Sequence, residues 1–497
     1  MRRAICAILL CLWAAGLPAD TWWVGFRDKQ GSWGMLTSPD HLLTSRAIER
    51  WQRQGIELDS ADLPVSTSYT DSLRGLGCRV LYTSRWLNGA VVSNGDTAFD
   101  KRAVRLPFVS EVQRTRRDSL HQSGAPQRRQ KQPEPSTTAN TACPDQFRLH
   151  RLQQLHAAGF RGQGMRIAVI DNGFLGVDTA PVFRDRRQQI VHTTDLVELG
   201  GNVYKHGQAQ HGSKVLALLL AGDTTGQQAV APEAEYLLFR TEDDASESLL
   251  EADNMVRAME MADSLGADII SASLGYFEFD DPAGNFTYEQ MDGRTARCSQ
   301  AASIAAGRGM LVCIAAGNEA QRTWHYIDAP ADAEGILAVG AVTADSVRSS
   351  FSSFGPTADG RIKPDVCALG SRVSICFPRA VSTGNNGTSY ACPIMAGAAA
   401  SLWSAMPELG SSELRDRLIR YASHTDRPDN ETGYGLPDVW AAYSDSKESA
   451  LTDAEERGGE KKVAEVWSLQ GVRLRETPQR GVSIVRYEDG TTAKIIR

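Results

Sequence analysis

Three short motifs, far apart in the chain, together carry the side chains of an activated nucleophile. Asp171-Asn-Gly supplies a carboxylate, His211-Gly-Ser an imidazole, and Gly-Thr-Ser389 a hydroxyl. A hydroxyl becomes a strong nucleophile when an imidazole removes its proton and a carboxylate orients that imidazole. The order carboxylate, imidazole, hydroxyl along the chain differs from the orders in chymotrypsin-like peptidases and in α/β-hydrolases.

Each motif adjoins a segment that the sequence predicts to be a buried strand or helix. The run at 166–170 is typical of a buried parallel strand, and Asp171 ends it. The apolar run at 214–220 predicts a buried helix that begins near His211. The small residues at 391–402 predict a fully buried helix whose N-terminus would present N–H groups and a positive dipole end to the serine.

These motifs resemble those of the subtilisin-like serine peptidases, the subtilases. Segments 168–173, 211–215 and 387–393 are similar to the aspartate, histidine and serine segments of that family. With the segments 273–275 and 315–318, which also resemble family motifs, five motifs stand in the family's order within residues 146–443. The resemblance implies the following residues: catalytic Asp171, His211 and Ser389, the oxyanion-hole Asn318, and the substrate-binding Ser273, Leu274, Gly275, Ala315, Ala316 and Gly317.

Other interpretations of these motifs are weaker. The glycines at 162 and 164 precede a strand, whereas a dinucleotide-binding loop must follow one. Ser389 lacks the G-x-S-x-G pattern of an esterase nucleophile elbow. His206 is a rival base, but no apolar helix follows it. A binding protein on an inactive subtilase scaffold stays an alternative that the complete triad disfavours.

Composition narrows the classes of function. The 497 residues are 42% hydrophobic and predict two or three folding units, and the net charge of −7 argues against nucleic-acid binding. The sequence has neither a C-x-x-C nor an H-E-x-x-H zinc motif. The acidic clusters at 242–244 and 278–281 are candidate calcium ligands without an ordered ligand spacing. We therefore expect no cofactor and no metal.

The cysteines predict both free thiols and one candidate disulfide. Two of the nine lie within the predicted signal peptide, and the odd remainder implies at least one free thiol in an exported protein. Cys313 and Cys392 stand in apolar runs and are expected to be small core residues. Cys367 and Cys376, separated by a turn-rich segment, are a candidate disulfide pair.

The N-terminal part of the sequence predicts export of a precursor. Residues 1–19 combine a basic start, an apolar stretch and a small-residue end, as a secretory signal peptide does, and no other run is long enough to span a membrane. Residues 20–113 predict a small α+β domain that resembles the inhibitory propeptide of subtilases, with a permanently attached domain as the alternative. Residues 114–145 are polar and predict a disordered, cleavable linker.

The rest of the chain predicts an α/β catalytic domain and a short β tail. Residues 146–443 alternate apolar strands with helical patterns, which predicts a subtilisin-like parallel sheet with helices on both faces. Residues 444–464 predict a second linker. Residues 465–497 alternate like β-strands and resemble the C-terminal sorting domain of type IX secretion in Bacteroidetes-type bacteria; a β-hairpin cap on the catalytic domain is the alternative.

Together these features predict a secreted or cell-surface serine endopeptidase made as a self-processed precursor. Its expected partners are protein or peptide substrates, its own propeptide and the type IX secretion machinery, with no nucleic acid and no transmembrane segment. The acidic loops at 242–247 and 278–281 predict a preference for basic residues upstream of the cleaved bond. The alternative is that these carboxylates pair with nearby cations of the enzyme itself.

Overall fold

The structure is a computed structural model, and it describes residues 19–34, 39–118, 145–206, 210–221, 229–379, 381–445, 463–468, 472–474, 482–487 and 492–496. The chain divides into two compact units, Met1–Trp440 and Ala441–Arg497. Except for Ala19, the predicted signal peptide lies outside the described residues. The same holds for most of the two predicted linkers.

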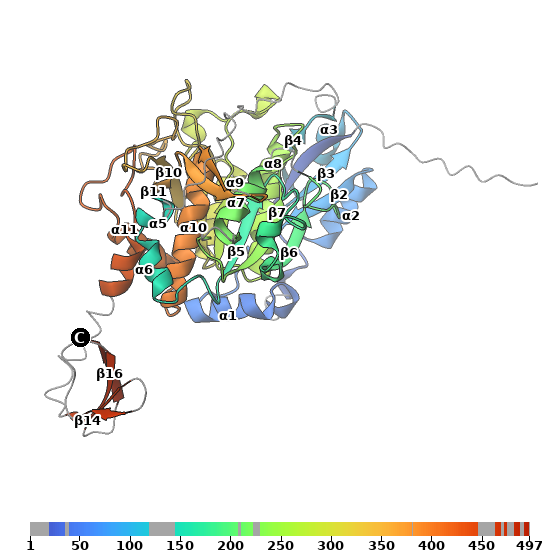
Figure 1. Ribbon diagram of the computed structural model, residues 1–497. Helices are drawn as coiled ribbons and strands as arrows, with labels where there is room; N and C mark the ends of the chain where they lie inside the picture. Colours follow the sequence, from blue (N-terminus) through green and yellow to red (C-terminus); the bar gives the residue numbers. More distant parts are fainter. Residues whose placement is uncertain are drawn as a thin grey trace, which may run out of the picture. The chain divides into compact units, whose positions relative to one another are not determined.

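A seven-stranded sheet forms the centre of the first unit (Figure 1). Its strands follow one another in the order β11 (Val366–Leu369), β10 (Leu337–Val342), β9 (Leu311–Ala315), β8 (Ile269–Ala272), β5 (Arg166–Asp171), β7 (Glu235–Arg240) and β6 (Ile190–Asp195). All neighbouring strands pair in parallel. Except at the edge strand β6, these strands are almost wholly buried, as parallel strands covered on both faces must be.

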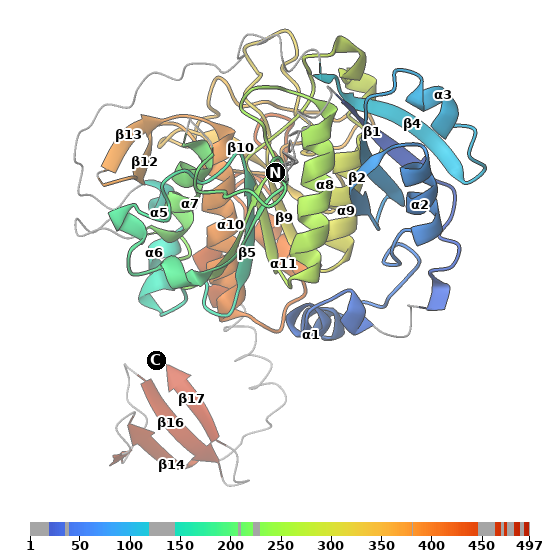
Figure 2. The same cartoon turned by 90° about the vertical axis from the view of Figure 1, so that its right-hand side faces the viewer.

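Helices cover both faces of this sheet. The helices α8 (Leu249–Ser264) and α9 (Arg297–Gly307) lie side by side on one face, and α7 (His211–Leu220) and α10 (Thr388–Ala405) lie on the other (Figure 2). Successive strand residues face opposite helix layers. Ile270 packs against α8 and α9, whereas the neighbouring Ser271 contacts Cys392 of α10. The predicted α/β class with helices on both faces is confirmed.

Shorter elements complete the catalytic part of this unit. They are α5 (Asp145–Arg148), α6 (Leu152–Ala157), α11 (Ser411–Arg420) and the hairpin of β12 (Val373–Cys376) with β13 (Val381–Asn385).

The N-terminal domain is a four-stranded antiparallel sheet with three helices. Its strands have the order β2 (Arg79–Ser84), β3 (Gly89–Asn94), β1 (Asp20–Phe26) and β4 (Val109–Arg116), and its helices are α1 (Ser45–Gln54), α2 (Thr67–Gly75) and α3 (Phe99–Ala103). The predicted α+β character is confirmed. Strand β4 runs three residues past the predicted boundary at Gln113, because the polar segment still pairs along β1, up to Thr21 opposite Arg116.

Two arginines of the N-terminal domain share one buried carboxylate of α8. Arg50 of α1 and Arg85, which follows β2, both form ion pairs with Asp263. The Arg50 side chain is 1% exposed and the Asp263 side chain is fully buried. Because both charges have left water, removal of one partner leaves the other costly to bury.

The second unit is a four-stranded antiparallel sheet. Its strands have the order β15 (Arg473–Leu474), β14 (Val463–Ser468), β16 (Val482–Tyr487) and β17 (Thr492–Ile496). The predicted short β tail is confirmed.

The proposed pairing of Cys367 with Cys376 is wrong. Cys367 is a free thiol on β11 and contacts the carbonyl oxygen of Thr432 at 3.4 Å, while Cys376 ends the separate strand β12. The expectation that Cys313 and Cys392 are core residues is confirmed, because both are fully buried.

Within the described ranges, we find no helix with both the length and the apolar character needed to cross a membrane.

Replacing Arg50 should loosen the N-terminal domain at α1. In a Ser389→Ala background, we expect Arg50→Leu to lower the opening free energy of α1 by about 2–3 kcal/mol, because Asp263 loses one of its two charged donors. The control Arg53→Leu removes a half-exposed partner of Asp268 at 3.4 Å and should cost less than about 1 kcal/mol. Amide hydrogen exchange of α1 measures the opening free energy in both variants. Equal losses in Arg50→Leu and Arg53→Leu would contradict the role of the buried ion pair.

Candidate active site

Three neighbouring strand ends bring the candidate residues together. Strand β5 ends at Asp171, β8 is followed by Ser273, and β9 is followed after two residues by Asn318. These strands are adjacent in the sheet, in the order β9, β8, β5. Since parallel strands end at the same edge, the three groups share one site at the carboxyl edge, where α/β sheets bind their ligands.

A short hydrogen bond joins Asp171 and His211. The imidazole Nδ1 lies 2.7 Å from Oδ1 of Asp171, which also accepts the backbone N–H of Asn172 at 2.8 Å. Asp171 is fully buried, whereas the His211 side chain is 25% exposed. A carboxylate only accepts hydrogen bonds, so Nδ1 carries the proton and Nε2 remains available as a base.

This bond depends on the absence of a side chain at position 212. A Cβ at Gly212 would lie 2.9 Å from the Cβ of Asp171 and would clash with the carbonyl oxygen of Gly173. The backbone N–H of Gly212 donates to Oδ1 of Asn172 at 3.3 Å. Helix α7 can therefore begin directly against the end of β5.

Ser389 lies in the first turn of α10. Its hydroxyl donates to the carbonyl oxygen of Ser273 at 3.2 Å, and the Ser273 hydroxyl donates to the carbonyl oxygen of Ser389 at 2.8 Å. The next residue, Tyr390, places its ring 6.0 Å from the imidazole of His211. Among the described residues, the Ser389 hydroxyl has its hydrogen bond to Ser273 and none to His211.

The amide of Asn318 has a fixed orientation. Its Oδ1 accepts the backbone N–H of Thr388 at 2.9 Å and the Thr388 hydroxyl at 3.2 Å. Because the oxygen is held on this side, the amide nitrogen is the group that can donate to a developing oxyanion. Thr388 was not predicted as a site residue: it belongs to the Gly-Thr-Ser motif, but nothing in the sequence shows that it reaches residue 318.

The predicted substrate-binding segments lie on either side of Ser389 and Asn318. Leu274 is half-buried and Gly275 is exposed, so this backbone is open to an extended peptide. On the other side, Ala315 ends β9 and is followed by Ala316 and Gly317. Gly317 has a φ of +108° and is tied to Thr388 by a 3.3 Å hydrogen bond from its N–H.

Two rival reactive groups do not join this arrangement. His206 forms an ion pair with Glu198 at 3.3 Å instead of contacting Asp171. Cys392 lies three residues after Ser389, but burial raises the pKa of its thiol to about 12. The thiol therefore stays protonated and unreactive near neutral pH.

One group of carboxylates comes close enough to hold a metal. Oxygens of Glu242, Glu247 and Glu251 lie within 4.8 Å of one another. Burial raises the pKa of Glu242 to about 7, and Oε1 of this residue accepts the hydroxyls of Thr241 and Tyr276 at 2.8 and 2.7 Å. The buried carboxyl group of Glu242 thus has its hydrogen-bond partners within the fold.

Glu251, the other buried member of the trio, is also satisfied by the fold. Its carboxylate accepts the backbone N–H groups of Asp243 and Ser248, at 2.8 and 2.7 Å. Both buried carboxylates of the trio therefore have hydrogen-bond donors within the fold.

Two carboxylates of the acidic loop at 278–281 have different partners. Glu278 pairs with Arg322 of the enzyme at 3.3 Å, whereas Asp281 pairs with Arg117, just past β4, at 2.6 Å. A cavity of about 310 Å³ lies between residues 112–117 and the loops at 246–249 and 279–284. The basic end of the N-terminal domain therefore leaves its sheet along the acidic loops.

Comparison with known proteins identifies the family of this chain. The model described as "Subtilase family" matches residues 162–435. The chain belongs to the subtilase family. A second model, the peptidase S8 propeptide domain of Bacteroidota, matches residues 21–134. The protein is thus a subtilisin-type serine peptidase with an N-terminal propeptide domain.

Individual relatives support the same assignment. Subtilisin DY of Bacillus licheniformis is 30% identical over 284 residues, which cover 56% of this subtilase and 90% of that protein. Subtilisin NAT of Bacillus subtilis subsp. natto is 29% identical over 272 residues, which cover 54% of this subtilase and 63% of that protein. The crystal structure of MycP1 from the ESX-1 type VII secretion system has a TM-score of 0.50 at 21% identity over 63% of this chain and 90% of that chain, a similarity of fold alone.

Adding a methyl group at position 212 should disable this subtilase without unfolding it. We expect Gly212→Ala to lower kcat/KM on peptides by about 100-fold or more, because the clash separates His211 from Asp171. Gly307→Ala is the control, since a Cβ there meets nothing within 4 Å. Steady-state kinetics with far-ultraviolet circular dichroism test this; full activity of Gly212→Ala would contradict it.

Proposed function

We propose that this subtilase is a secreted serine endopeptidase that cleaves peptide bonds through an acyl-enzyme. The observation that carries the proposal is the 2.7 Å hydrogen bond between the buried Asp171 and His211, with Ser389 at the start of α10 beside them. Asp171, His211 and Ser389 act as the triad. The match to the subtilase family supports the same reaction class.

The reaction begins when Nε2 of His211 takes the proton of Ser389. The serine oxygen attacks the substrate carbonyl, and Asp171 holds the imidazole in the required tautomer and stabilises the imidazolium. His211 then gives the proton to the leaving amine. In the second half, the same imidazole activates a water that releases the acyl group from Ser389.

Asn318 and the backbone N–H of Ser389 hold the oxyanion. Loss of one such donor costs about 10²–10³ in turnover in enzymes of this kind. The backbone of Ser273, Leu274 and Gly275 on one side, and of Ala315, Ala316 and Gly317 on the other, pairs with the extended substrate. Pairing through main-chain groups gives affinity without demanding a particular sequence.

The N-terminal domain acts as an intramolecular inhibitor in the precursor. The ion pairs of Arg50 and Arg85 with Asp263 support this role, and so does the contact of Arg117 with Asp281, which directs the following chain along the acidic loops. The enzyme removes this domain by cutting itself between Gln113 and Cys143. In this scheme residues 20–113 are the propeptide, 114–145 the cleaved linker and 146–443 the catalytic domain.

The two ends of the chain direct export. Residues 1–19 serve as a signal peptide, and residues 465–497, after a linker at 444–464, serve as a sorting domain for a type IX secretion machinery. The antiparallel sheet of β14 to β17 supports a separate C-terminal module. The mature protein is secreted or held at the cell surface.

Maturation tests self-processing directly. Secreted wild-type protein should lose its N-terminal domain, while Ser389→Ala should keep the full precursor mass after purification away from other proteases. Ser404→Ala, on the same helix but hydrogen-bonded to Ser401, is the control and should mature normally. Intact-mass spectrometry over time reads out all three, and wild-type rates of maturation in Ser389→Ala would exclude self-cleavage.

A further inference from the structure

Asp328 is a buried carboxylate without a part in the mechanism above. Its residue is 5% exposed, and its Oδ1 has no hydrogen-bond partner in the described part of the chain. It also takes part in none of the ion pairs found among these residues, although its neighbours Glu319 and Arg322 do. A buried carboxylate without an ion-pair partner is costly, so its position points to a cation that arrives with a ligand.

The carboxylate lies between the two substrate-binding segments. A Cβ at Gly275 would lie 2.8 Å from the Cβ of Asp328, and a Cβ at Gly317 would lie 2.5 Å from its Oδ2. The backbone N–H of Asp328 donates to the carbonyl oxygen of Ala316 at 3.2 Å. Both segments thus have a glycine, without a side chain, where they face this carboxylate.

A substrate side chain must enter this same space. The attacked carbonyl lies between Ser389, which contacts Ser273, and Asn318, which follows Gly317. The substrate residue immediately before the cleaved bond, which carries this carbonyl, therefore directs its side chain between the segments at 273–275 and 315–317.

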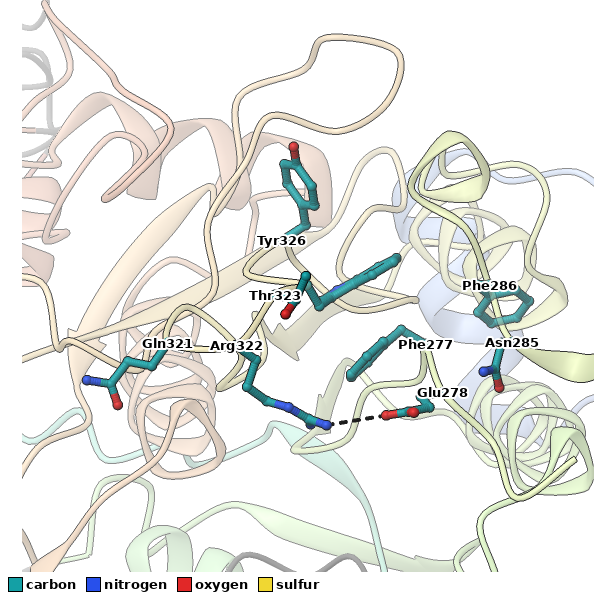
Figure 3. A pocket seen from close by; sticks show the side chains of 9 residues that line it. Phe277, Glu278, Asn285, Phe286, Gln321, Arg322, Thr323 and Tyr326 are labelled. Atoms are coloured by element: carbon teal, nitrogen blue, oxygen red, sulfur yellow. Dashed lines mark hydrogen bonds and ion pairs between the residues drawn. The ribbon is translucent and has the colours of Figure 1, made fainter. Parts of the chain in front are cut away.

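A neighbouring cation, Arg322, is already engaged elsewhere. Arg322 is in ion pairs with Glu319 at 2.7 Å and with Glu278 at 3.3 Å through its two terminal nitrogens. In Figure 3 its guanidinium group points toward Glu278 across the neighbouring pocket. The ring of Phe277, against which Arg322 lies at 5.5 Å, also holds it in this direction.

Burial and a nearby negative charge disfavour the ionised form of Asp328. Burial raises the pKa of its carboxyl well above the usual value, and the charge of Glu319 adds to this rise. The indole of Trp324 and the charge of Arg322 lower the pKa by less. An arriving guanidinium or ammonium group would offset this penalty.

We propose that Asp328 forms the floor of the pocket for the residue immediately before the cleaved bond, and that it selects arginine or lysine there. The inference rests on the proposed peptidase function and specifies its substrate class. A guanidinium group can bond both oxygens of a carboxylate, so arginine is the better fit. The chain itself offers such residues in the linker: Arg114, Arg116, Arg117, Arg128, Arg129 and Lys131.

The test compares substrates that differ at one position. Mature wild-type enzyme is assayed on four chromogenic peptides that are identical except for Arg, Lys, Leu or Phe before the cleaved bond. We expect kcat/KM to be highest for Arg. In Asp328→Asn, the ratio of kcat/KM for Arg to that for Leu should fall by about 30-fold or more, with Leu hydrolysis retained.

The matched control is Asp332→Asn. Asp332 is buried in the same loop, but its two oxygens accept the Ser299 hydroxyl at 2.5 Å and the Gly293 N–H at 2.7 Å. Its replacement should leave the Arg-to-Leu ratio unchanged. Because both substrates are measured on one preparation, the ratio does not depend on the fraction of enzyme that is folded.

A small cation provides a readout that does not need catalysis. Benzamidine should bind the mature wild-type enzyme in calorimetry and should bind Asp328→Asn at least about 30-fold more weakly. A wild-type preference for Leu or Phe, or an unchanged Arg-to-Leu ratio in Asp328→Asn, would overturn the proposal while leaving the peptidase function intact. Failure to cleave any of the four peptides would instead contradict the proposed function.

Discussion

The site depends on how closely α7 approaches the end of β5. That approach puts His211 within 2.7 Å of a fully buried carboxylate, and it is possible only because position 212 has no side chain. The parallel sheet positions the other groups of the site. Because β8 and β9 end beside β5, the segments that begin at Ser273 and Ala315 lie at the same edge of the sheet as Asp171. A rigid sheet edge therefore positions groups from Asp171 to Asn318, which lie far apart in the sequence.

Much of this arrangement was predictable from sequence because the governing patterns are local. An apolar strand pattern ending in Asp171 indicates a buried parallel strand with its last residue at the sheet edge, and the structure has β5 at Arg166–Asp171. The small-residue run at 391–402, predicted as a buried helix, lies within α10 at Thr388–Ala405. The motif order then identified the family, which the match over residues 162–435 confirms.

What escaped prediction was set by contacts between distant segments. The polar composition near Arg116 suggested a linker, but backbone pairing with β1 extends the strand, since hydrogen-bonded pairing tolerates exposed polar side chains. Sequence spacing suggested a bond from Cys367 to Cys376, yet the two thiols end up on separate strands. Asp328 gave no signal at all, because only the fold brings it behind Gly275 and Gly317.

The central claim is that Ser389 is a nucleophile activated by His211, and chemical labelling tests it most directly. A fluorophosphonate probe reacts with an activated serine and leaves an inactive scaffold unmodified. The account predicts one labelled residue in the mature enzyme, Ser389 by peptide mass spectrometry, with labelling lost in His211→Ala. Absence of label from the folded, mature wild-type protein, or equal labelling of His211→Ala, would contradict it.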